Sequence, residues 1–120
     1  MNNRRATGVA GEALAVKYLR TAGYTIVTTS WRCRIGEIDI VAKENDDLVF
    51  VEVRSRYEAE MDAALESIGQ RKRSKLIHLA HVYLNDNQLR DISWRIDIVA
   101  VTFMRHKPAL VEIINHAIGW

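Results

Sequence analysis

The chain has 120 residues, of which 48% are apolar and 27% charged, a composition that suits a soluble globular protein with its own core. No apolar run approaches the roughly 20 residues that cross a bilayer, and the N-terminal stretch lacks the long apolar segment of a secretory signal. The single cysteine, Cys33, excludes an intrachain disulfide and most thiolate zinc sites. We therefore expect residues 1–120 to form one domain in a reducing cytoplasm, with no membrane association.

The basic residues are clustered, although the formal net charge is only +2. One cluster falls at 71–75 and contains no acidic residue. Such a cluster suits contacts with phosphate groups, and a solvated helix face is the simpler explanation for it when it is taken alone. The buried carboxylates described below favour a nucleic-acid partner, because carboxylates among phosphate-binding groups are expected only where a metal ion neutralises them. The candidate nucleic-acid-binding residues are Arg32, Arg34, Arg71, Lys72 and Lys75.

The first predicted element is a helix from Thr7, which suits an N-cap, to Ala22, which precedes Gly23. On a helical wheel Glu12 falls inside the apolar arc, where a surface helix would not be expected to keep a carboxylate. Two interpretations stay open. Glu12 serves a functional site, or it is an acid near the helix N-terminus that interacts favourably with the helix dipole.

An acidic β-hairpin is predicted next. A first strand at 24–29 and a basic link at 30–34 lead into strands at 35–42 and 48–54, which fold back about residues 45–46. This register places Asp39 opposite Glu52, and Glu37 opposite Arg54, on one face of the sheet. A buried carboxylate needs a cation beside it, so the pattern predicts a divalent-metal site. The alternative is a buried salt bridge between Glu52 and Arg54 or its neighbours.

The rest of the chain is predicted to complete an α/β domain. A loop at 55–60 precedes a long helix at 61–84, which Gly69 breaks or kinks, and a strand at 93–103 follows. Pro108 introduces a last strand at 109–114. Asp97 is assigned to structure, either as a partner of Arg95 or as a residue of an exposed strand end. The order is α-β-β-β-α-β with one appended C-terminal strand, which predicts three layers with a mixed central sheet between helices.

This order and these acids resemble the restriction-endonuclease-like superfamily, also called PD-(D/E)XK nucleases. That superfamily has an α-β-β-β-α-β core, an acid on its second strand and Glu/Asp-X-Lys on its third. Asp39 matches the first position, and Glu52-Val53-Arg54 matches the second with arginine where lysine is usual. Glu12 is similar to the extra acid of the Holliday-junction resolvase branch, and Gln70 to a glutamine that often opens the second helix.

The sequence also resembles, over nearly its whole length, the bacterial family UPF0102, or YraN-like proteins. The resemblance rests on several short motifs spread along the chain: Gly8-Val9-Ala10-Gly11-Glu12, Tyr24-Thr25-Ile26, Arg32-Cys33-Arg34-Ile35-Gly36-Glu37-Ile38-Asp39, Phe50-Val51-Glu52-Val53-Arg54, the basic helix start at 70–75, and Arg95-Ile96-Asp97. Together the two resemblances imply a nuclease-like fold. They do not establish an activity, because fold and function separate easily.

The resemblance implies metal-dependent hydrolysis of phosphodiester bonds in DNA, with branched, flapped or single-stranded substrates suggested by the resolvase branch. Asp39 and Glu52 would coordinate Mg²⁺, for which Mn²⁺ could substitute, and Glu12 and Glu37 would hold a second metal or a metal-bound water. Arg54 would neutralise charge but cannot act as a general base, because arginine stays protonated. The implied catalytic set is Glu12, Asp39, Glu52, Arg54 and Gln70.

Other functions stay open at this point. The alternative to a nuclease is a non-catalytic nucleic-acid-binding module on a decayed nuclease fold, and a third class is an assembly protein without nucleic-acid contact. Resolvase-like enzymes need dimers to cut paired strands. The apolar residues Ile113, Ile114, Ile118 and Trp120 could therefore serve a homodimer contact, and an ordinary core contact explains them equally well.

Overall fold

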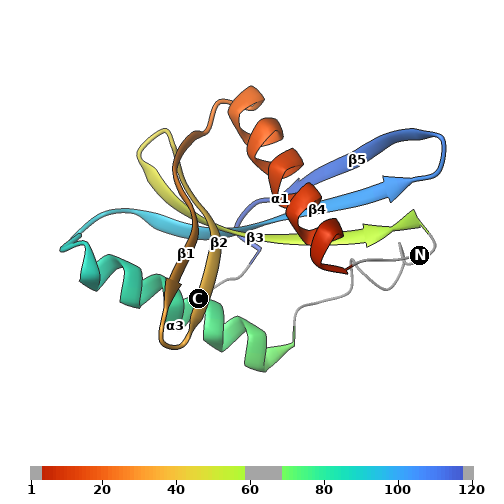
Figure 1. Cartoon of the computed structure of the whole chain (residues 1–120). Helices are drawn as coiled ribbons and strands as arrows, with labels where there is room; N and C mark the ends of the chain where they lie inside the picture. Colours follow the sequence, from red (N-terminus) through yellow and green to blue (C-terminus); the bar gives the residue numbers. More distant parts are fainter. Residues whose placement is uncertain (1–3, 59–68, 118–120) are drawn as a thin grey trace.

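The computed structural model describes residues 4–58 and 69–117 and contains two helices and one sheet within them (Figure 1). The elements are α1 (Arg4–Thr21), β1 (Thr25–Cys33), β2 (Gly36–Glu44), β3 (Asp47–Tyr57), α3 (Gln70–Asp86), β4 (Trp94–Met104) and β5 (Lys107–Ile114). No helix within the described ranges is long and apolar enough to cross a membrane.

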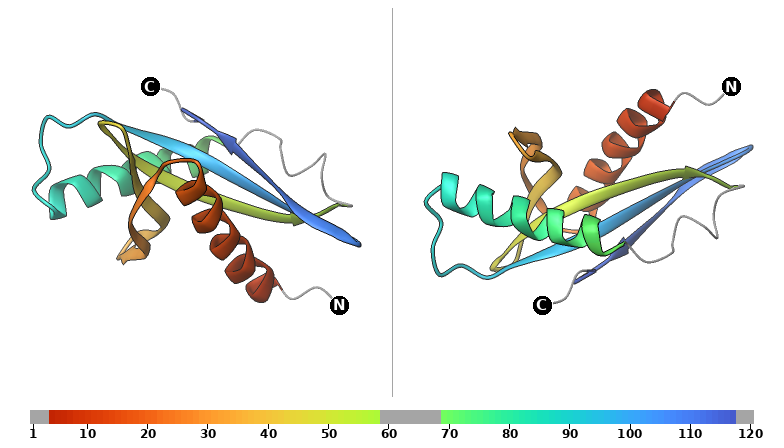
Figure 2. Two further views of the ribbon diagram at one scale, coloured as in Figure 1. Left: turned by 90° about the horizontal axis from the view of Figure 1, so that it is seen from above. Right: turned by 90° about the horizontal axis from the view of Figure 1, so that it is seen from below.

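The five-stranded sheet has the order β1-β2-β3-β4-β5. Only β3 and β4 run parallel, and the other neighbouring strands are antiparallel. The two helices lie on opposite faces of this sheet (Figure 2). The expected α/β architecture is therefore confirmed: a helix, three strands, a helix and two strands, around a mixed sheet.

Each helix covers its own core layer, because alternate side chains of the central strands point to opposite faces. On the α1 side, Ala15 and Leu19 pack with Val49 and Val51 of β3. On the α3 side, Phe50 of β3 belongs to the layer that contains the buried face of α3, made up of Leu76, Leu79, Ala80, Tyr83 and Leu84. Cover on both faces explains why the β3 sequence is continuously apolar from 48 to 51.

Several predicted element limits are wrong. The residues expected to form a basic link at 30–34 largely continue β1, because positions 31–33 pair with 36–38 of β2. Residues 55–57, expected to begin a loop, extend β3 because they pair with 101–103 of β4. Pro108 lies inside β5, the last strand in the order of this sheet, where a missing backbone donor is tolerated.

The predicted long second helix can be compared only in part. Its stretch at 61–68 lies outside the described residues, and the described helix begins at Gln70 with Gly69 as its N-cap. Of the apolar C-terminal residues, Ile113 packs into the α1-side core and Ile114 is exposed, while Ile118 and Trp120 lie outside the described ranges. The homodimer contact stays a prediction.

Candidate active site

The site begins where β2 separates from β3. The two strands pair from Glu44↔Asp47 to Ile40↔Val51, and that pairing does not continue to Asp39. The Asp39 side chain replaces the next backbone contact, because its Oδ2 accepts a hydrogen bond of 2.8 Å from the Val53 amide. The carboxyl of Asp39 is therefore held in one position against the backbone of β3.

Asp39 and Glu52 meet at this separation, as the hairpin register predicted. Burial is the main reason why the pKa of Asp39 is raised to about 7, and the negative charge of Glu52 is the next. A hydrogen bond between the two side chains and the charge of Glu12 act in the same direction, while the hydrogen bond from the Val53 amide opposes them. The site thus concentrates negative charge in a poorly solvated place.

The two carboxyls approach from different layers, although a single sheet face was predicted. Glu52 lies beside residues of the α3-side core, including Phe50 and Leu76. Asp39 borders a cleft on the α1 side. The prediction was wrong on this point because it assumed that β2 and β3 stay paired, whereas β2 turns away at Asp39 and its carboxyl reaches the gap between the strands.

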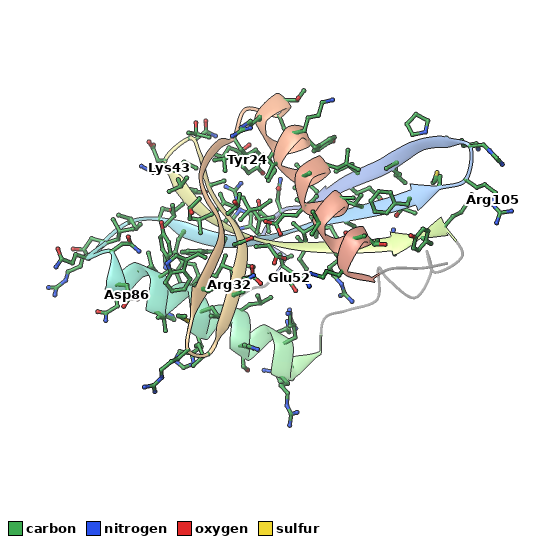
Figure 3. All side chains as sticks on the ribbon, in the orientation of Figure 1. Tyr24, Arg32, Lys43, Glu52, Asp86 and Arg105 are labelled. Carbon is green, nitrogen blue, oxygen red and sulfur yellow. The ribbon has the colours of Figure 1, made fainter. Side chains whose placement is uncertain are left out.

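Lys72 of α3 is the cation that contacts this pair. Its Nζ lies 2.9 Å from Oε2 of Glu52, whose side chain is only 12% exposed. Within the described residues, Arg54 forms no ion pair with an acidic side chain. The alternative of a Glu52–Arg54 salt bridge is therefore wrong, and α3 supplies the cation that pairs with Glu52. Figure 3 shows Glu52 in the central part of the sheet.

A cleft of about 820 Å³ opens beside Asp39. The first turns of α1 form one wall, β1 and β2 form another, and the end of β3 forms the floor. The residues that line it are Arg5, Thr7, Gly8, Val9, Glu12, Ser30, Arg32, Glu37, Asp39, Val53, Ser55, Arg56 and Tyr57. The predicted acids Glu12, Glu37 and Asp39 therefore border one space.

These acids do not all combine into one cluster. Oε1 of Glu12 accepts a hydrogen bond of 3.0 Å from Ser30, and Glu37 pairs with Arg32 at 3.5 Å. The expected position of Glu37 opposite Arg54 is wrong, because β2 has already left β3 at that point. Within the described part of the chain, no group of three or more His, Cys, Asp or Glu side chains is arranged to hold a metal ion.

The predicted basic residues lie on β1, on the turn that follows it and on α3. Arg32 lines the cleft, and Arg34 is exposed in the turn between β1 and β2. Lys75 of α3 reaches that same turn, since a Cβ on Gly36 would lie 3.3 Å from its Nζ. Arg71 and Lys72 are exposed in the first turn of α3. Basic groups near the β1–β2 turn and on α3 thus approach each other.

Two predicted catalytic residues are less closely connected to the cleft. Gln70 is the exposed first residue of α3 and is not among the residues that line the cleft. Arg54 is half-buried on β3, opposite Ala100 of β4. Each lies two positions along its element from a residue of the Glu52–Lys72 ion pair, and neither is itself part of that pair.

Sequence reasoning missed Tyr57 and Thr7 as cleft residues. The Tyr57 hydroxyl lies 3.0 Å from Oγ1 of Thr7, so the end of β3 is joined to the start of α1. The available signal was the alternation of β3, which continues through Val53 and Ser55 to Tyr57 on the α1 side. The prediction ended this strand at Arg54 and therefore did not use that signal.

A second polar cluster is structural. Arg95 contacts Asp97 at 3.1 Å and Asp47 at 2.7 Å, and it also pairs with Glu44. The predicted Arg95–Asp97 pair is confirmed. The two further acids, Glu44 and Asp47, lie at the closed end of the β2–β3 hairpin. Figure 3 shows Tyr24 at that same end and Arg32 away from it.

The fold and site define an α/β protein with a mixed sheet and a carboxylate pair at a strand separation, beside a cleft lined by both acidic and basic residues. The sequence model of "Uncharacterised protein family UPF0102" matches residues 11–101. A UPF0102 protein of Chloroflexus aurantiacus is 47% identical over 100 residues, which cover 82% of this chain and 81% of that protein. Another, of Roseiflexus castenholzii, is 41% identical over 121 residues and 98% of each chain. The chain belongs to the UPF0102 family, and the predicted membership is confirmed.

Proposed function

We propose that this protein is a metal-dependent deoxyribonuclease that hydrolyses phosphodiester bonds at the Asp39–Glu52 pair. The observation that supports this most is the raised pKa of Asp39 beside a second carboxylate in a cleft that basic residues border. Such an arrangement is costly for the protein alone, and perturbed carboxyl groups in clefts are typical of functional sites.

The donor set fits Mg²⁺, with Mn²⁺ as a substitute. Both ions prefer oxygen ligands, and Mg²⁺ is commonly held by one or two carboxylates while it keeps several waters. Asp39 and Glu52 would hold it, together with the Val53 carbonyl, and Glu12 and Glu37 would bind its waters or a second ion. When bound, the ion would raise the acidity of a coordinated water and neutralise charge on the phosphate.

The chain's own residues would perform the remaining tasks. Lys72 holds the Glu52 carboxylate in place and brings an ammonium group to the site. Arg54 would add a permanent positive charge near the phosphate but could not accept a proton. Glu12, fixed by Ser30, would orient a water from the opposite wall. Arg32, Arg34, Arg71 and Lys75 would bind the nucleic-acid backbone, and Gln70 would assist from the start of α3.

The decisive experiment is cleavage of labelled single-stranded, flapped and four-way-junction DNA with Mg²⁺ or Mn²⁺. Wild-type protein is compared with Asp39→Asn and Glu52→Gln, and Asp46→Asn in the β2–β3 turn serves as a matched control. We expect cleavage to fall to background in both site variants and with EDTA, and to stay unchanged in the control. Cleavage that survives in both site variants would contradict the proposal.

A second candidate function is nucleic-acid binding without cleavage. Arg54 favours it, because the residue that could exchange a proton is replaced by one that cannot. Salt-dependent DNA binding that is weakened in Arg71→Ala and Lys75→Ala, with no cleavage of any substrate and no calorimetric uptake of Mn²⁺, would support this alternative over the nuclease.

A further inference from the structure

We propose that the cleft beside Asp39 takes an unpaired nucleotide and that its base stacks on the ring of Tyr57. This inference rests on the proposed function and deepens it, since it makes single-stranded or frayed DNA the substrate of the site. It starts from Tyr57, which lines the same cleft as Asp39 and Glu12.

Tyr57 is held in place before any ligand binds. Its hydroxyl is tied to Thr7 of α1 at 3.0 Å, and its ring packs against Phe103 of β4 with a centroid distance of 6.1 Å and an interplanar angle of 44°. Contacts on two sides restrict its rotation, so little conformational entropy remains to be lost when a base stacks on it. An aromatic ring is a sequence-tolerant platform, because every base has a π-face.

The α1 wall of the cleft offers apolar surface and open space. Val9 of α1 lines the cleft and is 67% exposed, so its side chain is accessible to a ligand. Gly8 also lines it, and a Cβ on Gly8 would meet nothing within 4 Å. Apolar contact and free volume beside an aromatic ring suit the flat face of a base better than they suit a phosphate.

Two basic side chains of the cleft suit the phosphate backbone of the same strand. Arg5 of α1 and Arg32 of β1 line the cleft from two walls. A volume of about 820 Å³ falls in the range of pockets that enclose a single small molecule, which leaves room for one or two nucleotides and not for a turn of duplex. A strand would thus enter with its phosphates near the arginines and one base on Tyr57.

The test measures binding without cleavage, in Ca²⁺ or EDTA, by fluorescence anisotropy. A single-stranded oligonucleotide and a blunt duplex of the same length are compared, and 2-aminopurine in the single strand reports stacking by quenching. Tyr57→Ala removes the ring, and Tyr57→Phe keeps the ring but loses the hydroxyl contact to Thr7. Gly8→Leu narrows the cleft from the other wall without changing Tyr57, and thermal unfolding checks each variant.

We expect the wild type to prefer the single strand, and Tyr57→Ala to weaken that binding on the order of tenfold and to abolish the quenching. Tyr57→Phe should stay within about twofold and keep the quenching, since the stacking ring remains. Gly8→Leu should also weaken single-strand binding, which keeps the test informative if Tyr57→Ala fails to fold.

Equal affinity for single strand and duplex would overturn the inference. Single-strand binding that is unchanged in both Tyr57→Ala and Gly8→Leu would also overturn it. The proposed function can fail separately: single-strand binding that depends on Tyr57 but is never followed by cleavage in Mg²⁺ or Mn²⁺ would support the subsite and contradict the nuclease. Cleavage of duplex DNA that needs Asp39 and ignores Tyr57→Ala would do the reverse.

Discussion

Asp39 is under two opposing influences, and their balance decides the chemistry of the site. Burial and the charges of Glu52 and Glu12 favour its protonated form, while the Val53 amide favours its ionised form. The result is a pKa of about 7, close to neutral pH. A divalent cation would favour the ionised form, so its binding should release a proton and tighten as pH rises.

The first prediction concerns the stability of the metal-free protein. The pKa of Asp39 in the folded state, about 7, lies above its ordinary value of 3.8, so between these values the folded protein keeps a proton that the unfolded chain has lost. The free energy of unfolding should therefore fall as pH rises from about 4 to about 7, on the order of 3 kcal/mol through this group. Denaturant titrations in EDTA at several pH values measure it.

Asp39→Asn is the matched control for that prediction. It keeps the size of the side chain and an acceptor for the Val53 amide, but it cannot ionise. The variant should lose this part of the pH dependence and be more stable than wild type above pH 7. If wild type and variant show parallel curves from pH 4 to pH 8, the carboxyl is not perturbed as described.

At the scale of elements, the close approach of α1 to β3 forms the cleft floor. Gly11 allows it, because a Cβ at this position would lie 1.8 Å from Oγ of Ser55 and 3.0 Å from its Cβ. Gly8, one helical turn earlier, faces open space. The two glycines of α1 thus have different physical roles, although the sequence gives them the same motif.

Substituting the two glycines separately tests this difference. Gly11→Ala should lower the free energy of unfolding by about 1–3 kcal/mol, because the side chain overpacks the contact with Ser55. Gly8→Ala should raise it by up to about 1 kcal/mol through helix propensity. Gly11→Ala combined with Ser55→Gly should recover part of the loss. Equal effects of the two alanine substitutions, measured by urea unfolding, would show that α1 does not pack closely at Gly11.

Local patterns were enough to predict the elements whose limits depend on local chemistry. The hairpin register followed from alternation and a turn at 45–46, and the end of α1 followed from Gly23, which adopts a φ of 98°. The extensions of β1 and β3 were not predicted, because their last residues show no regular apolar alternation and are held by pairing with other strands. Asp39 and Glu52 were brought together correctly, and Lys72 was among the predicted basic residues, but its ion pair with Glu52 and the place of Tyr57 in the cleft depend on tertiary packing.

At the scale of the whole molecule, one buried network joins distant segments. Arg95 of β4 contacts acids of β2, β3 and β4, and the Tyr24 hydroxyl lies 3.2 Å from Asp97 and 3.2 Å from Asn115. Burial and the charge of Asp97 raise the pKa of Tyr24 to about 12, so its hydroxyl keeps its proton at neutral pH. The His116 amide also donates to Asp97, which fixes the end of the described chain.

Arg95→Leu should destabilise the whole fold by about 3–5 kcal/mol, because it leaves the fully buried carboxylate of Asp97 without its cation. Arg90→Leu, at an exposed position, is the matched control and should change stability by less than about 0.5 kcal/mol. Adding Asp97→Asn to Arg95→Leu should restore part of the loss, since it removes the uncompensated charge. Urea unfolding measures this, followed both by tryptophan fluorescence and by circular dichroism. A loss that Asp97→Asn does not reduce would mean that Arg95 acts through packing and not through its charge.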